Sequence, residues 1–219
     1  MNRPRVKICC ISDKEEALMA VRYGASALGL VSEMPSGPGV IPEELIREIA
    51  ARVPPPVATF LLTCKEEAAQ IIAQQHRCRV NTIQLCDRVP PQIFDELRKA
   101  LPGVHLVQVI HVSGEESVSE AKEVAGRVDA LLLDSGNQKL AVKELGGTGR
   151  THDWQISRRI VEAVDVPVFL AGGLNPDNVA DAIEQVRPFG LDVCSGVRTA
   201  GKLDEMKLER FFAAINSLS

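Results

Sequence analysis

Short apolar runs alternate with amphipathic segments along the whole chain. Eight runs rich in β-branched residues and leucine predict strands at 6–9, 27–31, 57–62, 82–85, 104–110, 130–133, 168–171 and 191–194. Segments with apolar residues at helical spacing predict helices at 13–23, 43–52, 66–76, 91–101, 115–125, 154–164, 176–186 and 204–218. Near-continuous runs such as ALLL and VFLA are typical of strands buried on both faces of a parallel sheet.

Eight strand–helix units in 219 residues predict the α/β class and a single (βα)8 TIM barrel domain over residues 1–219. A doubly wound open sheet is the structural alternative, but no GxGxxG motif follows the first predicted strand. Ser12 with Glu15 predicts a capping box at the first helix, and Asn175 before Pro176 predicts an N-cap at the seventh. In such a barrel the active site lies at the C-terminal ends of the strands.

Composition and charge exclude several functions. The chain is 45% hydrophobic and 25% charged, which is ordinary for a globular protein. Its formal net charge of −4 gives no basic surface, so we expect neither a nucleic acid nor a membrane as partner. No apolar run has membrane-spanning length, and MNRPRVKICC lacks the apolar stretch of a signal peptide.

The six cysteines and four histidines show no metal-ligand spacing. We therefore expect no metal site, and we expect free thiols in a reducing, cytoplasmic location. Barrels of this kind occur as monomers and as dimers, so the sequence leaves a homodimer open.

Glycine-rich turns follow the seventh and eighth predicted strands. LAGGLNPDN contains Gly172 and Gly173, and CSGV contains Ser195 and Gly196. Glycine lets the backbone approach an anion closely, and helix N-termini present free N–H groups. A phosphate site recurs at this place in (βα)8 barrels, so we predict one here. The alternative is that these glycines only form tight turns.

Asp134 ends the sixth predicted strand, where catalytic residues project, and a long glycine-rich loop containing Gly147 follows. A carboxyl group at a barrel mouth can act as a general acid when its surroundings raise its pKa. Taken alone, Asp134 fits the role of a helix cap or a loop-ordering residue equally well.

The first predicted strand places two cysteines side by side. By strand alternation Lys7 and Cys9 face one way, and Ile8 and Cys10 face the other. If Lys7 points into the barrel, Cys9 stands above it at the mouth, where the ammonium favours the thiolate that acts as a base. We expect Cys10 to pack outward under a helix as a small buried residue.

Several motifs, in the same order and at matching spacing, make the chain similar to the phosphoribosylanthranilate isomerase family of tryptophan biosynthesis. KIC, GASALGLV, IQL and LLLDS resemble the family's KICGI, GADALGFVF, VQLHG and LLDS. GGTGRTHDW, LAGGLNPDNV and DVCSGV resemble its GGTG-x-x-FDW, its matching glycine turn and DVSSGVE. The resemblance covers nearly the whole chain and implies a (βα)8 isomerase.

The resemblance implies an Amadori rearrangement of an N-substituted 5-phosphoribosylamine, a small phosphosugar, with no cofactor. It implies Cys9 as general base and Asp134 as general acid. It makes the four turn residues phosphate-loop positions and Asp192 a substrate contact. The full set of substrate- and phosphate-binding residues that we predict is Lys7, Gly147, Gly172, Gly173, Asp192, Ser195, Gly196 and Arg198.

Departures from the family pattern gather at the end that would hold the aromatic acid. Cys10 replaces a glycine, Gly39 replaces the arginine that pairs with the anthranilate carboxylate, QLCD replaces QLHG, and Arg198 replaces a glutamate. We take Arg198, and next Arg150, as candidates for a substitute cation. A phosphosugar isomerase with a different aglycone and a noncatalytic phosphosugar-binding barrel are the alternatives.

Overall fold

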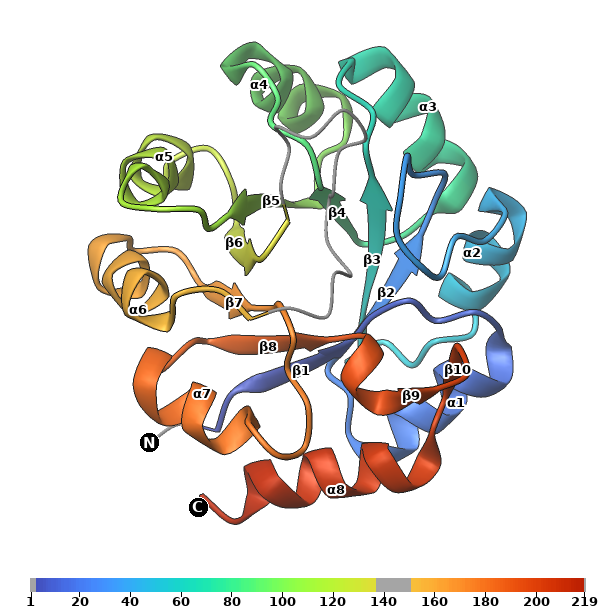
Figure 1. Ribbon diagram of the computed structural model, residues 1–219. Coiled ribbons are helices and arrows are strands. Elements are labelled where there is room, and N and C mark those ends of the chain that lie inside the picture. Colours follow the sequence, from blue (N-terminus) through green and yellow to red (C-terminus); the bar gives the residue numbers. More distant parts are fainter. Residues whose placement is uncertain (1–2, 137–150, 219) are drawn as a thin grey trace.

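The computed structural model describes residues 3–136 and 151–218. Eight parallel strands form a closed barrel in the order β1 to β8, with helices around it (Figure 1). The strands are β1 Arg5–Ile8, β2 Ala27–Val31, β3 Ala58–Thr63, β4 Thr82–Leu85, β5 His105–His111, β6 Ala130–Asp134, β7 Val168–Leu170 and β8 Gly190–Val193. Each predicted strand begins and ends within one residue of an observed strand, which confirms the barrel.

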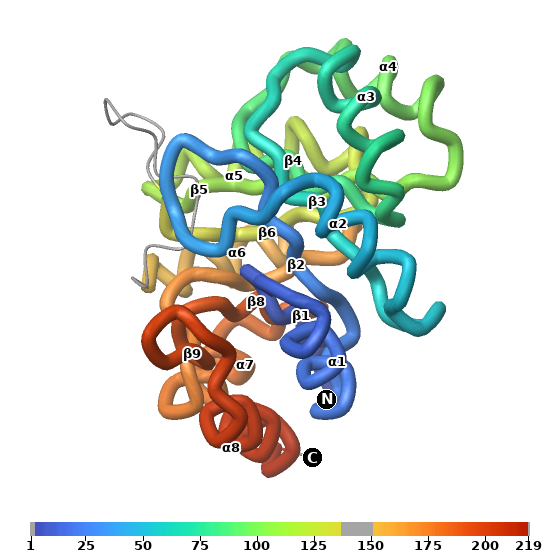
Figure 2. Tube along the Cα trace, turned by 90° about the vertical axis from the view of Figure 1, so that its right-hand side faces the viewer, coloured from blue at the N-terminus to red at the C-terminus, as the bar shows by residue number. Residues whose placement is uncertain are grey.

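Helices alternate with the strands and form the outer layer. They are α1 Lys14–Tyr23, α2 Glu43–Ala50, α3 Ala68–Cys78, α4 Pro91–Ala100, α5 Glu116–Ala125, α6 Trp154–Ala163, α7 Val179–Val186 and α8 Glu205–Asn216. Helix α8 packs against both α1 and α7 and completes the ring (Figure 1 and Figure 2). None of the described helices combines the length and apolar character needed to cross a bilayer.

Strand alternation sorts the apolar residues into two clusters. Outward-pointing residues such as Leu28 and Ile83 pack under the helices in the larger cluster. Inward-pointing residues such as Val107, Leu132 and Phe169 fill the barrel below its mouth. The interior of the barrel is therefore a packed core.

Closure of the barrel sets the register between its first and last strands. Residues Arg5 to Ile8 pair in parallel with Gly190 to Val193, so Lys7 lies beside Asp192. Both side chains point inward, as the alternation along β1 predicts for Lys7. An ammonium and a carboxylate from opposite ends of the chain are thereby buried next to each other.

Both predicted helix caps are displaced. Asp13 is the N-cap of α1 and accepts a hydrogen bond from the Glu16 amide at 2.7 Å, while the Glu16 carboxylate accepts one from the Ser12 amide at 3.0 Å. The cap is one residue later than predicted, because Asp13 has extended backbone and an equally good capping oxygen. Helix α7 begins at Val179, and Asn175 caps the preceding turn through the Asp177 amide.

A short hairpin that the sequence did not predict follows β8. The 3₁₀ helix η1 Ser195–Val197 leads into β9 Arg198–Thr199, which pairs antiparallel with β10 Lys202–Leu203. Ala200 and Gly201 between them both have positive φ, as a two-residue hairpin turn requires. Two-residue strands are too short for an alternation pattern, so their sequence gave no signal.

Candidate active site

A pocket with about 680 Å³ of empty space opens at the C-terminal ends of the strands. It brings together six of the predicted site residues. They are Cys9, Asp134, Gly172, Gly173, Asp192 and Ser195. The prediction that site residues gather at this mouth of the barrel therefore agrees with the geometry.

Three charged or ionisable groups lie together here: Cys9 and Asp192 line the pocket, and Lys7 is buried beside them. Lys7 Nζ lies 2.9 Å from Asp192 Oδ2 and 3.5 Å from Cys9 Sγ. Lys7 is fully buried, and its ammonium also lies 5.3 Å from the centre of the Phe60 ring. Burial alone lowers the pKa of Lys7, but Asp192 and Cys9 together raise it above its ordinary value. The amine is therefore a fixed positive charge beneath the Cys9 sulfur.

The pKa of Cys9 is lowered from that of an ordinary thiol. A hydrogen bond from the Cys10 thiol is the largest cause, and the Lys7 ammonium acts in the same direction. Burial and the Asp192 carboxylate oppose these effects without reversing them. Both favourable neighbours stabilise negative charge on sulfur, so Cys9 is suited to act as a base.

The expectation that Cys10 packs outward under a helix is wrong. Strand β1 ends at Ile8, and Cys10 has a left-handed backbone with φ of 61°, so strand alternation no longer applies to it. Its side chain lines the pocket next to Cys9. Contacts with the Cys194 and Cys9 thiols, together with burial, raise the pKa of Cys10, which keeps it a neutral hydrogen-bond donor.

Asp134 is the last residue of β6 and is buried in the pocket wall. Burial raises the pKa of this carboxyl group above its ordinary value, against the effect of a hydrogen bond from the Ser135 amide at 2.7 Å. Among the described residues, both hydrogen bonds to this carboxyl group fall on Oδ1. The other oxygen, Oδ2, is left for a molecule in the pocket.

The two glycine-rich turns lie against each other at the edge of the pocket. Gly172 and Gly173 have φ of 82° and 65°, a conformation that glycine adopts without strain. A Cβ on Gly196 would lie 1.9 Å from the Leu174 carbonyl oxygen, so only glycine permits this approach. Among the described residues, the amides of Gly173, Ser195 and Gly196 have no hydrogen-bond acceptor. These features suit an anion, as expected.

Arg198 does not lie where a substrate cation is needed. Its guanidinium is buried outside the pocket wall and is bound to the Glu16 carboxylate and to main-chain carbonyl groups. The prediction that Arg198 binds substrate is therefore corrected: the β9–β10 hairpin folds this side chain back under the end of β1. Gly147 and Arg150 lie outside the described residues.

The structure adds one polar pocket residue that the sequence interpretation missed, Gln84 on β4. Cys86 just after β4, and Met34 and Pro38 in the loop after β2, also line the pocket, and they lie past strand ends where the barrel prediction placed the site. A polar glutamine inside an apolar strand was an available signal for Gln84, because alternation places it on the same inward face as Cys86.

A buried thiol with a lowered pKa, a carboxyl group with a raised pKa and free amides share one barrel mouth. This combination defines the class of (βα)8 enzymes that move protons on small anionic molecules. Within that class, the chain belongs to the N-(5'-phosphoribosyl)anthranilate isomerase family, whose model, described as N-(5'phosphoribosyl)anthranilate (PRA) isomerase, matches residues 6–214.

Individual relatives agree with this family. The N-(5'-phosphoribosyl)anthranilate isomerase of Methanocella arvoryzae is 36% identical over 208 residues, which cover 95% of each chain. An isomerase crystallised with reduced 1-(o-carboxyphenylamino)-1-deoxyribulose 5-phosphate is 30% identical, with a TM-score of 0.80 over 98% of this chain and 99% of that one. Monomers generated from the dimeric isomerase of Thermotoga maritima are 28% identical, with a TM-score of 0.78 and the same coverage.

Proposed function

We propose that this chain catalyses the Amadori rearrangement of N-(5'-phosphoribosyl)anthranilate, with Cys9 as general base and Asp134 as general acid. The relatives' names and the reduced ribulose phosphate bound by one of them support this substrate. The observation that carries the proposal is that Cys9 and Asp134 line one pocket, with their pKa values shifted in opposite directions.

The first step opens the sugar ring. Neutral Asp134 donates its proton to the furanose ring oxygen while the bond between that oxygen and C1 breaks. The lone pair of the anthranilate nitrogen moves into the new C=N bond, which gives a protonated Schiff base. Burial of Asp134 favours the acid form that this step requires.

The second step moves a proton from carbon. The Cys9 thiolate removes the proton from C2, and the C–H electrons form a C1=C2 double bond as the C=N electrons return to nitrogen. The resulting enolamine tautomerises to the 1-amino-1-deoxyketose. The Lys7 ammonium beside Sγ keeps the thiolate available without accepting the proton itself.

Opposite pKa shifts matter because the working enzyme needs a thiolate together with a neutral carboxyl group. With unperturbed pKa values of about 8.5 and 3.9, this pair would be present at roughly one part in 10⁴–10⁵ between those two pH values, and at less outside them. Each pKa unit by which the difference between the two pKa values decreases raises that fraction about tenfold. We therefore expect kcat/KM to depend on pH as a bell-shaped curve. The two apparent pKa values of that curve should lie closer together than the unperturbed pKa values of the thiol and the carboxyl group.

The remaining pocket groups suit a phosphorylated sugar. The free amides of Gly173, Ser195 and Gly196 would bind the phosphate. Asp192 Oδ1 is buried in the pocket wall and has no donor among the described residues, so it can accept a sugar hydroxyl. Each of these groups would gain a partner that the described residues do not supply.

A related isomerase with a different aglycone is the second candidate. Within the described residues, no arginine or lysine lines the pocket to pair with the anthranilate carboxylate. Gly39, in place of the family's arginine, lies against Cys10 with φ of 82°. Slow turnover of N-(5'-phosphoribosyl)anthranilate together with rapid turnover of an analogue that lacks the carboxylate would favour this candidate.

A direct isomerase assay tests the proposal. We expect Cys9→Ser and Asp134→Asn each to lower kcat about 10²–10⁴-fold, because a serine hydroxyl is too weak a base and an amide cannot donate the proton. Cys64→Ser is the matched control, since Cys64 is a half-buried thiol outside the pocket wall. Near-normal turnover in either active-site variant would remove that residue from the mechanism.

We further propose that the protein is located in the cytoplasm and that two copies associate as a homodimer. All six cysteines are free thiols, which suits a reducing compartment. The dimeric Thermotoga maritima relative supports association of two copies. Sedimentation equilibrium distinguishes the monomer from the dimer directly.

A further inference from the structure

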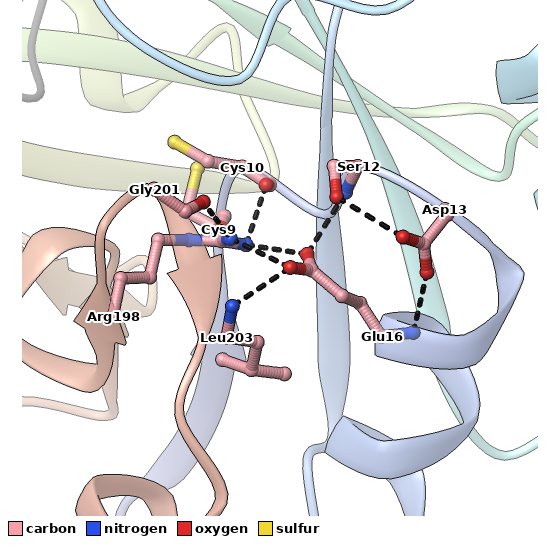
Figure 3. A network of polar contacts seen from close by, with 8 residues as sticks. All are labelled: Cys9, Cys10, Ser12, Asp13, Glu16, Arg198, Gly201 and Leu203. Carbon is pink, nitrogen blue, oxygen red and sulfur yellow. Dashed lines mark hydrogen bonds and ion pairs between the residues drawn. The ribbon is translucent and has the colours of Figure 1, made fainter.

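Arg198 lies beneath the main chain that holds the proposed base. Its Nη2 donates hydrogen bonds to the carbonyl oxygen of Cys10 at 2.5 Å and to that of Cys9 at 3.3 Å, while Nη1 donates to the carbonyl oxygen of Gly201 at 2.9 Å. Figure 3 shows the guanidinium between the Cys9–Cys10 main chain and the carboxylate of Glu16. Arg198 is only 8% exposed.

Glu16 holds the guanidinium in this place. Its two carboxylate oxygens lie 2.9 Å and 2.8 Å from Nη1 and Nη2, a bidentate pair. The same oxygens accept hydrogen bonds from the amides of Leu203 at 2.7 Å and Ser12 at 3.0 Å. Burial alone raises the pKa of Glu16, but Arg198 and these amides lower it, so the carboxylate stays ionised. The pair joins α1, the β9–β10 hairpin and the end of β1.

Among the described residues, the side chain of Arg198 is the hydrogen-bond donor to the carbonyl groups of Cys9 and Cys10. The Cys9 amide bonds to β8 and the Ile11 amide bonds to β2, but among the described residues no amide donates to the carbonyl oxygens of Cys9 and Cys10. Cys10 also has a left-handed backbone, which residues with a Cβ adopt only when their surroundings hold it. The hydrogen bonds from Arg198 hold the backbone of Cys10 in this conformation.

We infer that Arg198 is a positioning residue for Cys9, an inference that rests on the proposed function. By fixing both carbonyl groups, it sets the backbone from which the Cys9 thiol reaches the pocket, with the Cys10 side chain beside it. Glu16 fixes the guanidinium in turn. The charge of Arg198 serves the main chain of the protein and not the substrate.

Three variants and one control test this inference. Arg198→Lys keeps the charge beside Glu16 but cannot bond to both carbonyl groups and both carboxylate oxygens at once. Arg198→Met with Glu16→Leu removes both members, so no buried charge is left alone. Glu16→Gln keeps Arg198 but loosens its support. Arg210→Met is the control, since it breaks an exposed arginine–aspartate pair with Asp177.

We expect Arg198→Lys to lower kcat at least tenfold, with KM changed less than threefold, at a temperature where circular dichroism shows it folded. The rate at which iodoacetamide alkylates Cys9, followed by mass spectrometry across pH, should change in the same variants. Arg210→Met should change neither quantity. A merely structural role would lower the melting temperature and leave the kcat of folded enzyme and the alkylation profile of Cys9 as in the wild type.

The inference is overturned if folded Arg198→Lys keeps both kcat and Cys9 alkylation within twofold of wild type. If it fails to fold, the double variant and Glu16→Gln decide by the same criterion, and failure of all three to fold would overturn the inference in favour of a structural role. Absence of wild-type turnover would contradict the proposed function instead, while the alkylation rates would still test the position of Cys9.

Discussion

The side chain of Cys9 lies in a confined space beside Lys7 and Gly29. The sulfur lies 3.5 Å from Lys7 Nζ, and Gly29 on the neighbouring strand β2 faces both groups. A Cβ on Gly29 would lie 2.7 Å from Cys9 Sγ and 3.1 Å from Lys7 Nζ. Gly29 is therefore needed for space and not for backbone conformation, because no room remains for a methyl group beside the thiol and the ammonium.

We expect Gly29→Ala to lower kcat at least tenfold, because the methyl group must displace Cys9, Lys7 or both. Overpacking of this kind typically costs about 1–3 kcal/mol of stability. Gly190→Ala is the matched control, since its Cβ would lie 2.5 Å from Phe169 at the other end of the barrel. Enzyme assays and urea unfolding of both variants separate position from stability. Equal kcat losses in the two variants would contradict a specific role for Gly29.

At the scale of helices and strands, the sequence predicted the limits of an element best where its hydrophobic pattern continues along the whole element. Buried parallel strands such as β2 and β4 are bounded by polar residues and turns, so their limits were predicted without error. Cys10 was misplaced because alternation was extended two residues beyond the end of β1. Beyond the end of β1, the backbone φ of Cys10 depends on contacts with other elements. A local sequence pattern cannot predict such contacts.

The loops after β1 and β2 constrain each other through Cys10 and Gly39. A Cβ on Gly39 would lie 2.5 Å from the Cys10 Cβ and 2.8 Å from its Cα, and Gly39 has φ of 82°. A side chain at position 39 therefore meets both a steric clash and backbone strain. Gly39→Arg alone should lose stability without improving turnover, because the arginine cannot reach the pocket from a displaced loop.

A double-mutant cycle tests this coupling. We expect Gly39→Ala to lower the free energy of unfolding by about 2–4 kcal/mol, from backbone strain and overpacking together. Cys10→Gly removes the thiol side chain and the strain at position 10, so the double variant should recover about 1–2 kcal/mol relative to the sum of the single effects. Urea unfolding measures all four proteins. Strictly additive losses would show that the two loops do not constrain each other.

At the scale of the whole molecule, barrel closure decides which side chains meet. The sequence placed Asp134 at the end of the sixth strand and Lys7 on the same face of the first strand as Cys9, because the barrel was predictable from its repeating units. It could not show that Arg198 binds Glu16, since that contact depends on how the β9–β10 hairpin folds back onto α1. A charged residue at the mouth of a barrel has several partners within reach, and only the folded arrangement selects among them.

Closure also brings the turns after β7 and β8 against each other. If these turns bind an anion as we propose, ligand binding there should stabilise the whole fold. At about 10 mM phosphate and a Kd of about 1 mM, binding only to the native state contributes about 1.4 kcal/mol, which raises Tm by roughly 3–6 °C. Ribose 5-phosphate should raise Tm at least as much as phosphate does.

Gly173→Asp should abolish both shifts in Tm, because its carboxylate repels the anion. Gly103→Asp is the matched control: its φ of 84° imposes similar backbone strain, and no atom lies within 4 Å of its Cβ. Calorimetric scans of the three proteins with and without ligand measure the shifts. Unchanged melting of the wild type with both ligands, or a full shift in Gly173→Asp, would contradict an anion site at these turns.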